Sequence, residues 1–460
     1  MRVLFVAHGF PPDSTGGTEV HAAGLARILW RRGHDIAVLA REARPDLPEY
    51  HVRRDQVGEV PVIRVNNTFR ETSSFEETYR NGAIDAVARV LLDDGPPDVV
   101  HVHHLTCLST GIVDECVARG IPVIVTLHDY WLACHRGQLL DLDLERCDGP
   151  EPERCAVCAG LAASARPGIH RAARWLRVLD DHVPQALADA RRRFVSGLAR
   201  RAVPDSAASE AERRIEHMRA VCGRATRLLA PSKTLMGQFE RFGLPRERMQ
   251  LIELGIDTRP FARLNRQKSD RLRIGFVGSL LPSKAPHLAI EAVQGLPPRR
   301  AELTIAGSLA PYHGDSSYAS ALRPLLRSAG VNWLNGVPHP KVPSVYESLD
   351  VVVVPSVWLE NSPLVIKEAF AAGLPVVASS LGAMAEMVED GRNGLLFEPG
   401  NSGDLRRVLQ RLLDEPGLLD RLREGIPRVR TIDEDAAWTS ALYKDLWYER
   451  HGRPAPPPEP

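Results

Sequence analysis

Two glutamates spaced eight positions apart, Glu360 and Glu368, point most clearly to chemistry in this chain. The apolar run Val351–Val354 before them is typical of a buried parallel strand. Ser362 suits a helix N-cap and Pro363 suits the first helical position, so we expect a helix to begin between the two carboxylates. A helix N-terminus offers free N–H groups and a partial positive charge to an anion such as a diphosphate. Carboxylates on both sides of a phosphate site suit a sugar nucleotide, whose hydroxyls flank its phosphates.

A second candidate site is the loop Gly9–Thr18, which follows the expected strand Arg2–Val6 and precedes a helix. Gly16 and Gly17 would let the backbone approach a ligand closely, and Thr18 suits the N-cap of the helix. The loop lacks the G-x-G-x-x-G spacing, so it gives little support to a dinucleotide site. The alternative is an ordinary flexible turn.

Four cysteines within residues 134–158 form a third candidate site. Cys155 and Cys158 have the C-x-x-C spacing of half a tetrahedral zinc site, and Cys134 and Cys147 could supply the other two thiolates. A structural zinc ion, reduced cysteines without metal, and a redox role all remain open.

Asp141 and Asp143 in the same loop form a D-x-D pattern, which can hold a metal together with a nucleotide. They do not lie at the end of an expected strand, and two aspartates at this spacing are common by chance. We therefore expect no metal-nucleotide site here.

Length and composition limit the class of protein. A chain of 460 residues with 44% hydrophobic and 25% charged residues is expected to form two or three globular domains. A formal net charge of +0 removes any general argument for nucleic-acid binding. The first residues lead directly into a strand, and no apolar run reaches the ~18 residues of a membrane span. We expect a cytoplasmic protein, whose cysteines would be reduced or metal-bound.

Short apolar strands alternate with helical patterns along the chain, and this alternation predicts an α/β fold with parallel, doubly wound sheets. The pattern begins again after residue 270, which predicts two Rossmann-like domains. The expected parts are an N-terminal domain (1–262) with a cysteine-bearing loop (134–158) and a helical insertion (160–224), a C-terminal domain (263–430), a last helix (431–452) and a disordered tail (453–460).

The insertion 160–224 is rich in arginine and could contact anionic lipid or a lipid-linked acceptor. The alternative is a solvated helical insertion. The arginines concerned are Arg174, Arg177, Arg191–Arg193, Arg200, Arg201, Arg213 and Arg214.

In combination, several motifs of the C-terminal half resemble those of the retaining GT-B glycosyltransferases of family 4. The resemblance covers about residues 1–135 and 225–430, and Asp98–His103 matches the family's D-x-x-H-x-H pattern in the N-terminal half. The other matching segments are Ala230–Ser232, Gly255–Asp257, Gly278–Lys284, Leu303–Gly307, Glu360–Glu368, Gly382–Glu386 and Asn393–Phe397.

The resemblance implies roles for single residues in donor binding. Glu368 would bind the ribose hydroxyls of the nucleotide, and Glu360 would lie against the donor sugar. Lys284 would neutralise the diphosphate charge, together with the backbone amides of Ser362, Leu364 and Val365. His103 would face the donor sugar near the reacting centre, and Gly16, Gly17 and Ser279 would line the donor site.

The same resemblance implies two Rossmann-like domains facing each other across a cleft, with the acceptor bound by the N-terminal domain and the nucleotide sugar by the C-terminal one. The reaction would transfer a sugar from a UDP- or GDP-sugar to a glycan, a lipid-linked sugar or a small molecule. It would retain the anomeric configuration and need no catalytic metal. The location would be cytoplasmic, with peripheral contact at the inner membrane face through residues 160–224.

This chain departs from the family at Ser279, where an arginine is usual. The change removes a guanidinium that would make bidentate phosphate contacts. Other interpretations therefore remain open: a sugar-nucleotide epimerase of the same architecture, or a non-catalytic binding protein with a degenerate donor site. For single residues, Glu360, Glu368 and Lys284 could be ordinary surface charges, and His103 a hydrogen-bonded core histidine.

Overall fold

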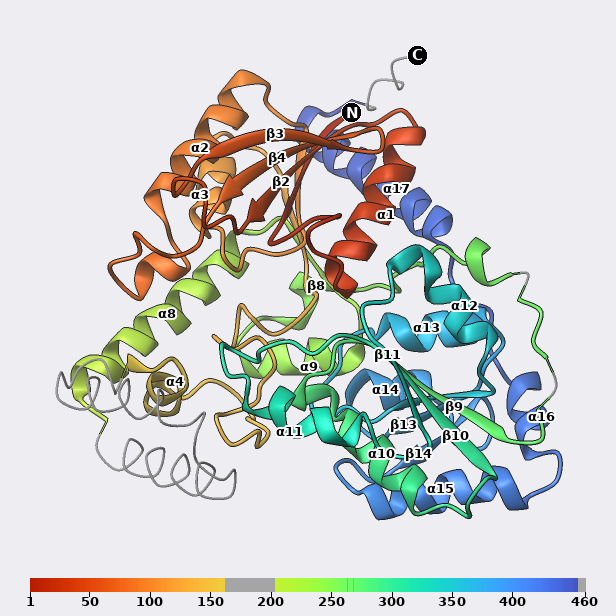
Figure 1. Cartoon of the computed structure of the whole chain (residues 1–460). Coiled ribbons are helices and arrows are strands. Elements are labelled where there is room, and N and C mark those ends of the chain that lie inside the picture. Colours follow the sequence, from red (N-terminus) through yellow and green to blue (C-terminus); the bar gives the residue numbers. More distant parts are fainter. Residues whose placement is uncertain (162–202, 263, 268, 454–460) are drawn as a thin grey trace. The chain divides into compact units, whose positions relative to one another are not determined.

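The computed structural model describes residues 1–161, 203–262, 264–267 and 269–453 (Figure 1). The chain divides into two compact units. Most of the predicted arginine-rich helices and all but the first residue of the predicted disordered tail lie outside the described residues. Unit 1 comprises Met1–Pro231, Leu235–Ile252 and Ala436–Pro460, and unit 2 comprises Ser232–Thr234 and Glu253–Asp435.

Unit 1 contains an eight-stranded sheet with the strand order β3-β4-β2-β1-β5-β6-β7-β8. All of its neighbouring strands pair in parallel except β3 and β4, which pair antiparallel at one edge. Its strands are β1 (Arg2–Ala7), β2 (Asp35–Glu42), β3 (Val52–Val57), β4 (Val60–Asn66), β5 (Val99–Val102), β6 (Val123–Thr126), β7 (Arg227–Ala230) and β8 (Met249–Leu251). The described helices are α1 (Gly17–Arg31), α2 (Gly82–Asp94), α3 (Gly111–Ala118), α4 (Pro152–Cys158), α8 (Asp205–Arg224) and α9 (Lys233–Arg241).

Unit 2 contains a six-stranded, fully parallel sheet with the order β11-β10-β9-β12-β13-β14. Its strands are β9 (Leu272–Val277), β10 (Ala301–Ala306), β11 (Val331–Leu334), β12 (Val351–Val354), β13 (Val376–Ser379) and β14 (Gly394–Phe397). Its helices are α10 (Pro286–Gln294), α11 (Ser317–Leu325), α12 (Val342–Glu347), α13 (Leu364–Ala371), α14 (Gly382–Met387), α15 (Ser402–Asp414) and α16 (Leu418–Glu424). Helix α17 (Ile432–His451) begins in unit 2, and its residues from Ala436 onward belong to unit 1.

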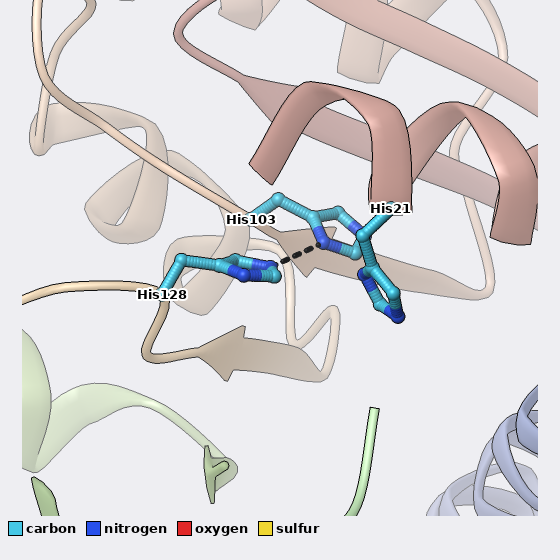
Figure 2. A group of neighbouring side chains, drawn as sticks. All are labelled: His21, His103 and His128. Atoms are coloured by element: carbon cyan, nitrogen blue, oxygen red, sulfur yellow. Dashed lines mark hydrogen bonds between the residues drawn. The ribbon is translucent and has the colours of Figure 1, made fainter. Parts of the chain in front are cut away.

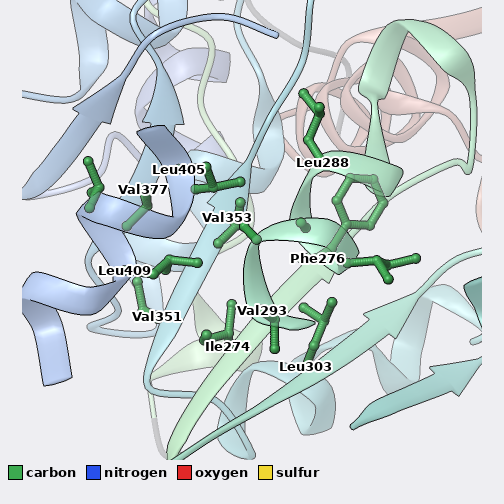
Figure 3. Close-up of a cluster of buried hydrophobic side chains, with 14 of the residues drawn as sticks. Ile274, Phe276, Leu288, Val293, Leu303, Val351, Val353, Val377, Leu405 and Leu409 are labelled. Carbon is green, nitrogen blue, oxygen red and sulfur yellow. The ribbon is translucent and has the colours of Figure 1, made fainter. Parts of the chain in front are cut away.

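Helices cover both faces of the unit 2 sheet, which explains why its central strands are apolar without alternation. On one face, side chains of α10 and α15 pack against Ile274, Val353 and neighbouring strand residues (Figure 3). On the other face, Ile366 of α13 packs with Val352 and Val354. Both sequence halves are therefore doubly wound α/β units with parallel sheets, as predicted.

Each sheet reverses its winding direction at one pair of neighbouring strands. In unit 1 the reversal lies between β1 and β5, and in unit 2 it lies between β9 and β12. At such a point the loops after the two strands diverge to opposite faces of the sheet, which leaves room for a ligand at the carboxyl edge. The loops expected to hold His103, Lys284 and Glu360 all follow these strands.

Two predicted helix starts are wrong in detail. Helix α13 begins at Leu364, and its N-cap is Pro363, with φ −62° and ψ 107°, rather than Ser362. The carbonyl of Pro363 accepts the first-turn bond from the amide of Ile366 at 3.0 Å. Helix α1 begins at Gly17 with Gly16 as N-cap, so Thr18 lies inside the helix.

The prediction that Arg214 belongs to a lipid-facing surface is also wrong. Arg214 is 3% exposed, and its guanidinium donates to the backbone oxygen of Trp131 at 2.8 Å. The guanidinium also lies over the rings of Trp131 and Tyr79, at 5.2 and 5.7 Å from their centroids. Among the described residues, no helix is both long and apolar enough to cross a bilayer.

Candidate functional site

In unit 2, one carboxylate oxygen of Glu360 collects three side-chain donors. Oε1 accepts hydrogen bonds from Ser356 Oγ at 2.7 Å and Trp358 Nε1 at 2.9 Å, and it forms an ion pair with the ammonium of Lys284. The Glu360 side chain is 4% exposed and that of Lys284 is 27% exposed. The carboxylate is thus held in place in a largely water-free setting, where charge-assisted hydrogen bonds are strong.

The indole of Trp358 contacts both members of this pair. Its N–H donates to Glu360, and the Lys284 ammonium lies 5.4 Å from its ring centroid, a cation–π distance. Trp358 is buried, so it is a packing residue that also orients the charges. The amide of Val357 donates to the carbonyl of Ser283 at 2.9 Å, which ties together the two loops that carry Lys284 and Glu360.

Glu368 lies one turn into α13, where its Oε2 accepts a hydrogen bond from the Tyr346 hydroxyl at 2.7 Å. Burial raises the pKa of Glu368 to about 7, although the hydrogen bond from Tyr346 opposes the rise. Burial, and then the neighbouring Glu368, raises the pKa of Tyr346 well above its usual value, so the phenol remains a donor. Glu368 therefore changes charge near neutral pH.

The structure places the residues expected to bind phosphate at the start of α13 and in the loop after β9. Leu364 and Val365 occupy the first two positions of α13, where amide groups have no partner within the helix. Ser362 precedes the N-cap residue. Ser279 follows Gly278 in the loop after β9, and this loop approaches the chain after β10 so closely that a Cβ at Gly307 would lie 1.9 Å from the Gly278 oxygen.

In unit 1, His103 follows β5 directly and is 1% exposed. Its Nδ1 lies 3.1 Å from His128 Nε2, and its ring stacks on that of His101 with 4.3 Å between centroids. Burial, reinforced by the neighbouring histidines His101, His128 and His21, lowers the pKa of His103 well below its ordinary value. The imidazole is therefore uncharged at neutral pH.

The loop with Gly16 and Gly17 is organised by a buried glutamate, Glu19. Glu19 accepts a hydrogen bond from Ser14 Oγ at 2.5 Å and lies 3.2 Å from His8 Nε2. Burial acts to raise the pKa of Glu19, but His8 and Ser14 lower it to about 2. A Cβ at Gly16 would lie 2.6 Å from Glu19 Oε2, so Gly16 makes room for this carboxylate.

The four candidate zinc ligands are free thiols, and Cys134, Cys147 and Cys158 all influence the charge of Cys155. Burial, and then the thiol of Cys134, raises the pKa of Cys155 to about 12 and that of Cys158 to about 11. Cys147 Sγ lies 2.9 Å from the oxygen of Gly149. No three of these sulfurs belong to a described group whose ligand atoms all lie within 4.8 Å of one another, so the zinc site stays a prediction.

The D-x-D pattern in the same loop has a structural role. The carboxylate of Asp141 accepts hydrogen bonds from the amides of Asp143 and Glu145, at 2.9 and 3.0 Å. It also pairs with Arg154 at 3.0 Å. Asp141 therefore stabilises the turn.

Several site residues were missed by the sequence argument. Tyr346 gives no local signal, because it lies 22 positions before the glutamate that it contacts. Glu19 and His128 were detectable in principle, since Glu19 follows the glycine pair and His128 follows the apolar stretch of β6. His21 lies on the buried face of α1, where a single histidine is indistinguishable from a core residue.

Comparisons with known proteins identify the family and the fold of the chain. A model described as Glycosyl transferases group 1 matches residues 259–428, and one described as Glycosyltransferase Family 4 matches residues 15–149. A D-inositol 3-phosphate glycosyltransferase of Paenarthrobacter aurescens is 31% identical over 460 residues, which covers 94% of this chain and 93% of that protein. The enzyme of the same name from Thermomonospora curvata is 27% identical over 450 residues, covering 92% and 88%.

Among solved structures, Anabaena HepE in complex with UDP-glucose superposes with a TM-score of 0.63 at 16% identity, covering 96% of this chain and 100% of that one. The likeness confirms the predicted fold. The family matches and the relative that is 31% identical over nearly the whole chain show the family. The chain belongs to the group 1 glycosyltransferases of family 4, has their GT-B fold, and is a transferase of the hexosyltransferase type.

Proposed function

We propose that this protein transfers a sugar from a UDP- or GDP-sugar to an acceptor hydroxyl, with retention of the anomeric configuration and without a catalytic metal. Unit 2 binds the donor and unit 1 binds the acceptor. The observation that carries the proposal is the three-donor site on Glu360, at the strand reversal of unit 2, with Glu368 on the helix that follows.

Several features of unit 2 support a nucleotide-sugar donor. The diphosphate would lie at the N-terminus of α13, where the amides of Leu364 and Val365 and the helix dipole attract negative charge. Lys284 is the nearest cation to Glu360 in the described chain, and it would share its charge with the departing diphosphate. Glu368 would accept hydrogen bonds from the ribose hydroxyls. HepE, a structural relative, binds UDP-glucose, which supports a donor of this class.

For the acceptor, the first compound to test is D-inositol 3-phosphate, because several relatives carry that substrate in their names. A glycan or a lipid-linked sugar remains the wider proposal, as does membrane contact through residues 160–224. The assignment of His103 to the donor sugar stays a prediction.

The reaction is tested by incubating the protein with a panel of UDP- and GDP-sugars and acceptors. We expect the product linkage to have the anomeric configuration of the donor, as measured by NMR coupling constants. We also expect initial rates with EDTA added at the start to equal those with added Mg²⁺ or Mn²⁺. Inversion, or a strict need for Mn²⁺, would refute the mechanism. Conversion of the nucleotide sugar without acceptor would indicate an epimerase, and binding without any turnover would indicate a non-catalytic protein.

The role of Glu368 predicts a pH dependence of donor affinity. A carboxyl group with a pKa of about 7 is protonated below pH 7 and charged above it, and only the charged form accepts two strong hydrogen bonds from a ribose. We expect affinity for the bound nucleotide sugar to rise about tenfold from pH 6 to pH 8, and to stay nearly flat in Glu368→Gln. Calorimetry with an intact nucleotide sugar measures this directly, because its esterified diphosphate does not titrate in that range.

Glu291→Gln is the matched control for this experiment, since Glu291 is exposed on α10 of the same unit. It should keep the pH dependence of the wild-type protein. An equal slope in wild type and Glu368→Gln would remove Glu368 from donor binding.

We further propose that Cys134, Cys147, Cys155 and Cys158 hold a structural zinc ion. The support is the charge of the buried Arg214, which lies close to the thiols of Cys134 and Cys155. Among the described residues Arg214 has no carboxylate in an ion pair, and its Nε has no hydrogen-bond partner. A buried cation needs a compensating charge, and four zinc-bound thiolates would carry a net charge of −2.

Metal analysis of protein purified without chelator tests this site. We expect about one zinc ion per chain, which is lost in the double variant Cys155→Ser/Cys158→Ser together with thermal stability. The site would be ruled out if exhaustive chelation removed all zinc from the wild-type protein without changing its thermal stability.

A further inference from the structure

Three histidines of unit 1 converge from separate elements: His21 from α1, His103 from the end of β5 and His128 from the segment after β6 (Figure 2). Each offers one ring nitrogen, and these three nitrogens all lie within 4.8 Å of one another. In the described part of the chain, no other group of three or more His, Cys, Asp or Glu residues meets this condition. The cluster lies at the strand reversal of unit 1, between β1 and β5.

The spacing of the rings matches that of a metal centre. A tetrahedral zinc ion with Zn–N bonds of about 2.1 Å holds its nitrogens about 3.4 Å apart and its imidazole centroids about 5 Å apart. The His103–His128 and His21–His128 centroids are 5.3 and 5.4 Å apart, and the His21–His103 centroids are 6.0 Å apart. His103 Nδ1 and His128 Nε2 are separated by 3.1 Å. Small side-chain rotations would therefore bring all three rings onto one ion.

The surroundings suit an uncharged ligand set. The group whose ligand atoms converge consists of three imidazoles and contains no carboxylate or thiol. Neutral imidazole is the form that binds transition metals. A small pocket lined by His103, His128 and Asp129 lies beside the cluster, and His128 is half-buried rather than fully enclosed, which provides an entry path.

We propose that His21, His103 and His128 form a binding site for a divalent transition-metal ion of the zinc class, and that occupation of this site inhibits the enzyme. Three protein ligands leave the fourth tetrahedral position for water or an acceptor group. Imidazole ligands select zinc, copper and nickel over Mg²⁺ and Ca²⁺, which prefer oxygen. The ion would take the lone pair of His103 and occupy space in the unit that we propose binds the acceptor. Inhibition thus rests on the proposed function, whereas metal binding does not.

The test is a titration with Co²⁺, whose visible spectrum reports its ligands. The protein is used as purified, so that any zinc on the cysteines stays in place. We expect one saturable equivalent of Co²⁺ with the spectrum of a tetrahedral imidazole site and no thiolate-to-metal charge-transfer band. Added Zn²⁺ should displace the Co²⁺. His21→Asn and His128→Asn should each weaken binding more than about 100-fold, beyond the roughly 10- to 100-fold loss expected for a residue that only orients a ligand.

His51→Asn is the matched control, because His51 is an exposed histidine of the same unit, and it should bind Co²⁺ like wild type. Thermal melting shows whether each variant is folded. Asparagine is chosen as the replacement because it keeps a polar side chain at each position. Unchanged affinity in folded His21→Asn and His128→Asn, a thiolate spectrum, or no saturable binding to wild type would overturn the site.

In the transfer assay, Zn²⁺ should lower the rate of wild type and a chelator should restore it. If no transfer is found with any donor, the proposed function fails while the Co²⁺ titration still decides the metal site. Saturable Co²⁺ binding without inhibition by Zn²⁺ would refute the inhibitory role.

Discussion

The parallel pairing of β9 with β12 is the constraint on which the proposed donor site depends. Lys284 follows β9 and Glu360 follows β12, and although 76 positions separate them in the sequence, the two strands end side by side. The pairing register requires Gly275, because a Cβ there would lie 2.1 Å from a Leu349 side-chain atom. The winding reverses at this pair, so no crossover helix covers the loops that carry the two charges.

The charges in this site are nearly balanced before any ligand binds. Glu360 is buried and has Lys284, Ser356 and Trp358 on one oxygen. The positive charge available to a diphosphate is then the partly exposed Lys284 and the N-terminus of α13, since Ser279 supplies none. Under the proposed function, donor binding would depend more strongly on Lys284 than it would with an arginine in place of Ser279. The histidine cluster of unit 1 lies at the corresponding strand reversal. In both units the candidate site residues therefore follow strands at which the winding reverses.

Sequence periodicity predicted the parallel α/β units, because short apolar strands alternate with helical patterns and a strand such as β12 is a continuous apolar run bounded by aspartate and proline. It also placed Glu360 between the end of β12 and the start of the next helix. It failed on the helix starts at α1 and α13, where Gly16 and Pro363 rather than the hydroxyl residues serve as N-caps. Tyr346 and His21 were not predictable, since their roles depend on contacts between elements that are distant in the chain. Arg214 was misassigned because the arginine-rich composition of its segment does not show which side of the helix faces the core.

The central claim is that Lys284, held by Glu360, binds the donor diphosphate. Calorimetric titration of wild type, Lys284→Ala and Lys341→Ala with UDP-glucose and GDP-mannose tests it most directly, with Lys341 as an exposed lysine of the same unit. Loss of a charge-assisted phosphate contact is worth about 1.5–3 kcal/mol, or about 10- to 100-fold in affinity. The account predicts that one of the two nucleotide sugars binds wild type and Lys341→Ala with similar affinity, and Lys284→Ala at least tenfold more weakly. Equal affinity of folded Lys284→Ala and Lys341→Ala would contradict it.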